Sequence, residues 1–322
     1  MASKGSSTLT RSTSRSMLHS LERMAGGRRQ DAKAETPVSR TSTRGSRRTS
    51  TPGPVLKWAG GKSQLLAQYD RWFPRRFAAY FEPFVGGAAV FFHLLPSTVR
   101  HRVRLADLNE DLIEVYRTLQ TDLEALIQHL AEHAEQHSEE HFYRVRSWTT
   151  EELAPVERAA RLIYLNKTCY NGLYRVNSSG QFNVPFGRYK NPSILVEPRL
   201  RAAARALEGV ELAVEGFESV LEHAREGDLV YFDPPYHPLS ATSRFTSYTR
   251  WDFGEAEQVR LSEVFRELAS RRVQVLLSNS NSPLIHQLYQ GFPIHLVRAN
   301  RFINSKGDSR HAIHEVLVCS FR

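Results

Sequence analysis

The chain has 322 residues, enough for one large domain or two smaller ones, and its 41% hydrophobic residues can form a core. It has no run of about 18 apolar residues, so we expect no membrane span. The two cysteines, Cys169 and Cys319, form no motif and indicate neither a disulfide framework nor a zinc site. The expected compartment is a reducing cytoplasm.

The formal net charge of +9 is unevenly distributed. Residues 1–52 hold 11 Lys/Arg against 3 Asp/Glu, whereas residues 53–322 hold 32 against 31. Within the second part, the window 157–205 holds 9 basic and 2 acidic residues. A local basic surface indicates nucleic-acid binding better than the overall charge does, although solvated basic faces would give the same count.

Residues 1–52 are rich in Ser, Thr and Arg and poor in aromatic and β-branched aliphatic residues, which predicts a disordered tail. Without an apolar h-region it is not a secretory signal. A transit peptide, an accessory DNA-contacting tail and a start codon placed too early all remain open.

In chain order, the pattern predicts a helix at 61–70, a strand at 80–84, a glycine turn and a helix at 88–95. A strand at 102–107 precedes a long helix from 109 to 137 and another at 155–168. Residues 170–192 are expected to form a loop with room for one hairpin. The last third alternates again, with strands at 228–232, 273–278 and 315–321 and a helix at 254–270. This order predicts an α/β fold with an open sheet and a helical insertion.

A glycine turn follows the first predicted strand. Gly86 and Gly87 precede a helix, and Asp107 ends the next strand 21 residues after Gly86. Such glycines let the backbone approach a ligand, and an acidic residue at the second strand is typical of ribose binding. The spacing is not G-x-G-x-x-G, which disfavours a nicotinamide cofactor. A purely structural turn is the alternative.

The segment "YFDPPYHP" follows directly on the buried strand at 228–232. Asp233, Pro234, Pro235 and Tyr236 should therefore lie at the carboxyl edge of the sheet. Asp233 and the Pro234 carbonyl can accept the two N–H bonds of an exocyclic amine, and Tyr236 can stack on a planar base. The alternative is a proline turn with a half-buried tyrosine.

The segment "LKWAGGKSQLL" contains half of a phosphate-binding loop. In G-x-x-x-x-G-K-[ST] the first glycine would be at position 56, where the chain has Leu56, and no strand precedes the segment. With Trp58 nearby, Lys62 is better interpreted as a cation beside a charged, planar ligand than as part of a nucleotide hydrolase.

Two further features of the sequence admit a functional and a structural interpretation. His129, His133, His137 and His141 recur at i, i+4, which is metal-ligand spacing, but neighbouring acids and the absence of cysteine partners favour a solvated polar face without a metal. The loop 300–312, with Gly, Ser and basic residues, is expected either to close over the site or to be an ordinary connection.

From Val55 to Phe321 the chain resembles the Dam-type DNA adenine methyltransferases. The motifs are "KWAGGKSQLL", "FEPFVGGAAVFF", "LADLNEDLI", "LNKTCYNGLYRVNSSGQFNVPFGRYKNP", "YFDPPYHPLSATSRFTSY" and "LSNS". The resemblance implies an open, Rossmann-like methyltransferase sheet flanked by helices, with a mainly helical target-recognition domain inserted in it. The implied boundaries are 53–116 and 203–322 for the catalytic domain and 117–202 for target recognition.

The same resemblance implies transfer of a methyl group from S-adenosylmethionine to the N6 of a flipped-out adenine, with GATC as the target in double-stranded DNA. Arg175 matches an arginine that helps to read the first guanine, and Tyr170 is suited to wedge beside the flipped base. The implied cofactor residues are Trp58, Lys62, Phe84, Gly86, Gly87, Asp107 and Asp233, and Ala88 stands where glycine is frequent. The implied DNA-binding residues are Tyr170, Asn171, Leu173, Arg175, Asn183, Pro185 and Arg188.

The implied partners are DNA and, as a further candidate, a restriction endonuclease for the same site; the implied location is the cytoplasm at the nucleoid. Three alternatives remain open: another target sequence, cytosine N4 as the methylated atom, and a non-catalytic DNA-binding protein. Cytosine C5 chemistry is disfavoured, because neither Cys169 nor Cys319 follows a proline as its nucleophile usually does.

Overall fold

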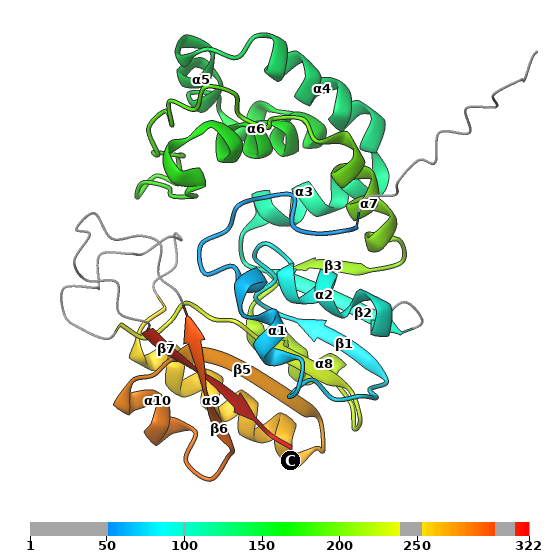
Figure 1. The fold of residues 1–322 in the computed structure, drawn as a ribbon, viewed down its shortest axis with the longest axis vertical. Helices are drawn as coiled ribbons and strands as arrows, with labels where there is room; N and C mark the ends of the chain where they lie inside the picture. Colours follow the sequence, from blue (N-terminus) through cyan, green and yellow to red (C-terminus); the bar gives the residue numbers. More distant parts are fainter. Residues whose placement is uncertain (1–50, 99–100, 239–252, 300–312, 322) are drawn as a thin grey trace, which may run out of the picture. The chain divides into compact units, whose positions relative to one another are not determined.

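The structure is a computed structural model and describes residues 51–98, 101–238, 253–299 and 313–321. These residues contain a seven-stranded sheet in the order β3-β2-β1-β4-β5-β7-β6 (Figure 1). The strands are β1 (Ala79–Glu82), β2 (Arg102–Asp107), β3 (Glu211–Val214), β4 (Leu229–Phe232), β5 (Gln274–Ser280), β6 (Ile294–Ala299) and β7 (Ile313–Cys319). Strands β1 to β5 are parallel, whereas β7 is antiparallel to both β5 and β6. The predicted α/β sheet is confirmed.

The strand order reverses between β1 and β4. The chain runs outward from β1 to β2 and β3, and returns to β4 on the other side of β1. Tyr80 pairs with Leu229 and Phe81 with Val230, so these strands are direct neighbours. In open α/β sheets ligands bind outside the carboxyl ends of the strands at such a reversal. The turns that follow β1 and β4 both begin there.

Side chains alternate between the two faces of the sheet. Tyr80 and Tyr231 belong to a core that includes residues of α1 (Leu66–Tyr69) and α2 (Ala89–Thr98). Phe81 and Phe232 belong to a second core, covered by α8 (Val220–His223), α9 (Glu255–Ser270) and α10 (Pro283–Leu288). All residues of β4 are buried, as expected for a parallel strand covered on both faces.

The middle of the chain is helical, as predicted. It contains α3 (Glu110–Thr121), α4 (Leu123–Glu135), α5 (Glu139–Arg146), α6 (Pro155–Thr168) and α7 (Glu197–Leu207). Helix α3 packs against α6, α7 and β3. One apolar core runs from Leu105 in the sheet through Leu112 to Leu162 in α6. The described residues belong to one compact unit, so the helices share the core of the sheet.

Several predicted elements need correction. The long helix at 109–137 is wrong, because the chain leaves helical geometry at Asp122 (φ −144°, ψ 48°) and α4 starts as a separate helix. The predicted helix at 61–70 is a 3-10 turn, η1 (Lys62–Gln64), followed by the single-turn α1. The elements α5, α7, α10, β3 and β6 were not predicted from the sequence.

The remaining predictions concern the hairpin, membrane spans, the tail and the loop 300–312. Two antiparallel bridges, Cys169 with Phe186 and Val176 with Phe182, confirm a hairpin within 170–192. No helix in the described part of the chain is both long and apolar enough to cross a membrane. The expected tail, apart from its last two residues, and the loop 300–312 lie outside the described residues.

Candidate active site

Trp58 and the glycine turn after β1 are in direct contact. Gly86 has φ +45°, and a Cβ atom there would lie 2.8 Å from Trp58 Cδ1; at Gly87 it would lie 3.2 Å from Trp58 Cβ. The turn is also held from outside, because Tyr116 Oη donates to the Gly86 carbonyl at 2.6 Å and Gly86 N donates to Asp107 at 3.1 Å. Four predicted cofactor residues therefore lie together.

The Asp107 carboxylate is oriented by backbone amides. Oδ2 accepts from Gly86 N and Oδ1 accepts from Asn109 N at 3.0 Å. Burial raises the pKa of Asp107 to about 6 in spite of these hydrogen bonds, so the group is mainly ionised at neutral pH. Each oxygen keeps a further lone pair for a hydroxyl donor, which is the donor set that a ribose presents.

Phe84 belongs to an aromatic cluster at the same edge of the sheet. Its ring stacks on Phe217 at 5.6 Å between centroids and meets Phe253 edge-on at 5.7 Å. Glu82, which was not among the predicted site residues, is 2% exposed and accepts from Tyr80 Oη at 2.8 Å. Burial raises the pKa of Glu82 to about 8, so its carboxyl group is mostly protonated at pH 7. The sequence feature that could have identified Glu82 is an acidic residue at the end of the apolar strand "AYFE".

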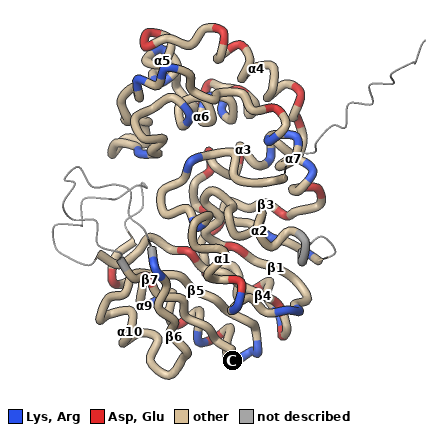
Figure 2. The backbone as a smooth tube through the Cα atoms, viewed as in Figure 1, with Lys and Arg blue, Asp and Glu red and all other residues tan. Residues whose placement is uncertain are grey.

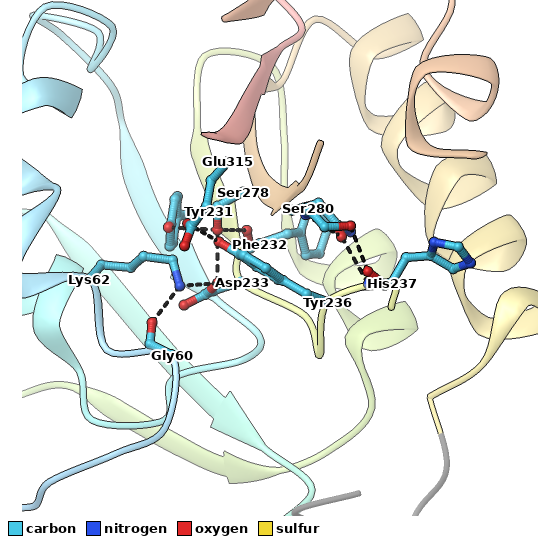
Figure 3. Close-up of polar contacts among 11 residues, drawn as sticks. Gly60, Lys62, Tyr231, Phe232, Asp233, Tyr236, His237, Ser278, Ser280 and Glu315 are labelled. Carbon is cyan, nitrogen blue, oxygen red and sulfur yellow. Dashed lines mark hydrogen bonds and ion pairs between the residues drawn. The ribbon is translucent and has the colours of Figure 1, made fainter. Parts of the chain in front are cut away.

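Asp233 is held on one of its two oxygens. Lys62 Nζ lies 2.7 Å and Ser278 Oγ 2.8 Å from Asp233 Oδ1 (Figure 3). Lys62 is 3% exposed, also donates to the Gly60 carbonyl, and lies 4.8 Å from the centre of the Tyr236 ring. Lys62 thus joins the glycine segment to the turn after β4, two predicted site segments that are far apart in sequence.

The rest of the Asp-Pro-Pro-Tyr turn is fixed by neighbouring elements. Tyr236 Oη donates to Glu315 on β7 at 2.7 Å, and Gln258 Nε2 on α9 donates to the Pro235 carbonyl at 2.9 Å. Burial foremost, and then the Asp233 charge, raise the pKa of Tyr236 well above its usual value, so the phenol is a neutral donor. Among the described residues, the Pro234 carbonyl accepts no hydrogen bond.

The predicted DNA-binding residues lie on one segment, 170–188, whose two ends are joined by hydrogen bonds. Tyr170 is 54% exposed, and its N–H donates to the Pro185 carbonyl at 2.8 Å. Arg175 Nε donates to Asn183 Oδ1 at 2.6 Å, and Asn183 N donates to the Arg175 carbonyl at 3.0 Å. The others are exposed or half-buried: Asn171, Leu173 and Arg188. Asn183 therefore contacts Arg175 itself, which the sequence did not reveal.

A buried asparagine joins this segment to the glycine-lysine segment. Asn166 is fully buried, accepts from Lys57 N at 2.8 Å, and donates to the carbonyls of Lys57 at 2.8 Å and Gly172 at 3.1 Å. Next to it, Trp58 stacks on Tyr174 at 5.1 Å. The expected cofactor and DNA segments are thereby fixed to each other.

Charge counting overstated the basic surface of window 157–205. Arg161 is 6% exposed and donates to the carbonyls of Val145 and Arg146. Arg158 pairs with Asp111 at 2.9 Å, and Arg201 pairs with Glu197 and Glu124. Figure 2 shows Lys and Arg interspersed with Asp and Glu over the helical part of the chain. The exposed basic residues of the window are Arg175, Arg188, Lys190, Arg199 and Arg205.

The expected solvated histidine face is wrong for two of its four residues. His133 and His141 are 6% and 4% exposed, and their ring nitrogens lie 3.0 Å apart. His137 Nδ1 contacts Tyr164 Oη at 3.0 Å. The helices α4, α5 and α6 pack together around these rings, which the i, i+4 pattern could not show. In the described residues no group of three or more His, Cys, Asp or Glu is arranged to hold a metal ion.

Comparison with known proteins agrees with this geometry. Residues 58–303 match the family described as D12 class N6 adenine-specific DNA methyltransferase. The type II methyltransferase M.MjaIII of Methanocaldococcus jannaschii is 43% identical over 83% of this chain and 99% of its own length. The type II methyltransferase M1.LlaDCHI of Lactococcus lactis subsp. cremoris is 42% identical over 83% and 95%. The DNA adenine methylase of Escherichia coli K12 is 37% identical over 82% and 93%. The chain belongs to the D12 class of N6 adenine-specific DNA methyltransferases.

Proposed function

We propose that this adenine-N6 DNA methyltransferase acts at GATC and that Asp233 is its principal catalytic residue. Family membership already implies double-stranded DNA as the substrate and S-adenosylmethionine as the methyl donor. The observation that carries the assignment of Asp233 is that Lys62 and Ser278 both bond its Oδ1, at the strand-order reversal where ligands bind.

The site suits S-adenosylmethionine. Asp107, with its two oxygens oriented by backbone amides, would take the ribose hydroxyls, and the 84–87 turn would lie beside the cofactor. Trp58 and Lys62 would line the same side. When bound, S-adenosylmethionine supplies an electrophilic methyl group on a sulfonium.

The chain's own groups would prepare the adenine amine. Its lone pair is delocalised into the ring, so the amine is a poor nucleophile. Acceptors at Asp233 and at the Pro234 carbonyl favour a more pyramidal nitrogen, and Tyr236 would stack on the extruded base. Most of the acceleration would come from positioning and from placed acceptors.

The segment 170–188 would read the DNA. The Arg175 guanidinium has five N–H donors. Asn183 accepts from Nε and from one N–H of Nη2. The remaining N–H groups of Nη1 and Nη2 are left for a bidentate contact to guanine. Tyr170, with its exposed ring, would wedge beside the flipped adenine. Asn171, Leu173, Pro185 and Arg188 would complete the contact surface. The resemblance of Arg175 to the guanine-reading arginine of Dam-type enzymes supports GATC.

A cognate restriction endonuclease is a candidate partner, supported by the type II names of two relatives. The separation into a catalytic domain (53–116 and 203–322) and a recognition domain (117–202) is proposed as a functional division of one packed unit.

The test is methylation of matched duplexes by the full chain with labelled S-adenosylmethionine. One duplex carries GATC, one a changed first base pair, and one GATC with N6-methyladenine on both strands. We expect label only on the first, recovered as N6-methyladenine. Label on cytosine would refute the adenine assignment, and equal labelling of the first two would refute GATC. Asp233→Ala should lose turnover while keeping its melting temperature.

A further inference from the structure

The segment Leu277–Ser280, "LSNS", forms the end of β5, which runs past the end of β4. The parallel register pairs Phe232 with Leu277, so the following residues, Asp233 and Ser278, are next to each other across the two strands. Ser278, Asn279 and Ser280 are buried, with exposed fractions of 0%, 0% and 6%. Polar groups this deeply buried need hydrogen-bond partners, and the turn after β4 supplies them.

The direction of the hydrogen bonds at Ser278 follows from counting hydrogens. Ser278 Oγ lies 2.8 Å from Asp233 Oδ1, 3.0 Å from Tyr231 Oη and 3.4 Å from the Phe232 carbonyl oxygen. A carboxylate paired with a lysine only accepts, and a serine hydroxyl has one hydrogen, which goes to the nearer, charged acceptor rather than to the carbonyl. Ser278 therefore donates to Asp233, and Tyr231 donates to Ser278. Each bond in such a chain polarises the next, so Tyr231 makes Ser278 a better donor.

The result is an asymmetric carboxylate. Oδ1 of Asp233 receives both Ser278 and Lys62, whereas among the described residues Oδ2 receives no hydrogen bond (Figure 3). The Asp233 side chain is 19% exposed. A carboxylate held on one oxygen by two donors from different elements has little freedom to rotate, and its second oxygen keeps its accepting capacity.

The same strand end holds the far side of the turn. Asn279 Oδ1 accepts from His237 N at 3.2 Å, and Asn279 Nδ2 donates to Gln258, which donates to the Pro235 carbonyl. Ser280 Oγ donates to the His237 carbonyl at 2.7 Å. The turn is therefore anchored at both ends by three consecutive residues of β5.

We propose that Ser278, oriented by Tyr231, is a positioning residue for methyl transfer: it pins Oδ1 of Asp233 so that Oδ2 accepts from the target amine. The proposal rests on the proposed function of Asp233. Ser278 acts through Asp233 and touches no substrate, so it changes the rate of the chemical step and leaves binding unchanged. A role limited to satisfying buried polar groups would change stability alone.

The experiment compares single-turnover methylation and steady-state constants of the full-length wild type, Ser278→Ala and Ser262→Ala. Ser262 is the matched control, because it is 4% exposed and, among the residues that the structure describes, its hydroxyl bonds only to the Val259 carbonyl in its own helix. We expect Ser278→Ala to lower kcat about 10- to 100-fold, the effect of one hydrogen bond to a charged group. KM for both substrates should stay within about threefold. Ser278→Thr, which keeps the hydroxyl, should recover most of the rate.

Two results would overturn the proposal: equal kcat for Ser278→Ala and Ser262→Ala, or a loss confined to KM. If Ser278→Ala shows no melting transition, Tyr231→Phe is tested in its place, because this variant keeps Ser278 and removes only the hydroxyl that donates to it. Tyr231→Phe should lower kcat about three- to tenfold. An unchanged kcat would overturn the proposal. Asp233→Ala runs in the same assay. If it remains active, the role of Asp233 has failed, whereas a dead Asp233→Ala beside a fully active Ser278→Ala refutes the positioning role alone.

Discussion

Replacing His133 by glutamine should flatten the loss of stability at acidic pH. The His133 ring stacks on Tyr164 at 4.7 Å between centroids, and its Nδ1 faces Nε2 of His141. The guanidinium of Arg144 lies 2.7 Å from His141 Nδ1 and can only donate. His141 must therefore donate from Nε2 to His133 Nδ1, and both rings are neutral. Protonating either ring breaks this chain.

The magnitude follows from the pKa of His133. Burial first, and then the charges of His141 and His129, lower it from 6.5 to about 4. Between these values the unfolded chain binds more protons than the folded one, so the free energy of unfolding decreases as pH falls below 6.5. Linkage gives a loss of about 2 kcal/mol between pH 7.5 and pH 5 from this residue alone. The pKa values of His137 and His141 are lowered too, which adds in the same direction.

The assay is urea unfolding of wild type and His133→Gln at pH 7.5, 6 and 5. Glu82 and Asp107, whose raised pKa values act in the opposite direction, cancel in the difference between the two proteins. His286→Gln, at an exposed position on α10 away from these helices, is the control and should keep the wild-type dependence. An equal loss at pH 5 in wild type and His133→Gln would refute the reasoning.

Two further substitutions test the site. Arg175→Ala should reduce discrimination at one guanine of the target by about 1–3 kcal/mol, measured by competition binding. Asn183→Ala should reduce this discrimination in part, because it frees the Arg175 guanidinium. A uniform loss of affinity across DNA sequences would instead make Arg175 a phosphate contact. Gly86→Ala should cost more stability and cofactor affinity than Gly209→Ala. Both glycines have positive φ, but in the described residues only the first would place a Cβ atom against Trp58, so equal melting temperatures would contradict the contact.

Much of the site was predictable from sequence, because it consists of turns that follow apolar strands. "DLVYF" predicts a strand buried on both faces, and the residues after it must lie at its carboxyl end. The same reasoning placed Gly86, Gly87 and Asp107. The misread elements were those whose stability comes from neighbours. Strands β3 and β6 lie at the edges of the sheet. The break at Asp122 separates α3, which packs on β2 and β3 as well as on α6 and α7, from α4, which packs on α6 and α7.

The sequence by itself determined the fold class, the order of the elements and the residue types at the carboxyl edge, since these depend on periodicity and local turn chemistry. The tertiary structure alone decided which groups meet. Lys62 and Ser278 reach the same oxygen of Asp233 from different elements, Asn183 engages Arg175, and two histidines with metal-like spacing are buried against each other. These contacts join segments tens to hundreds of residues apart or depend on the packing of neighbouring helices, and local pattern carries no information about such pairings.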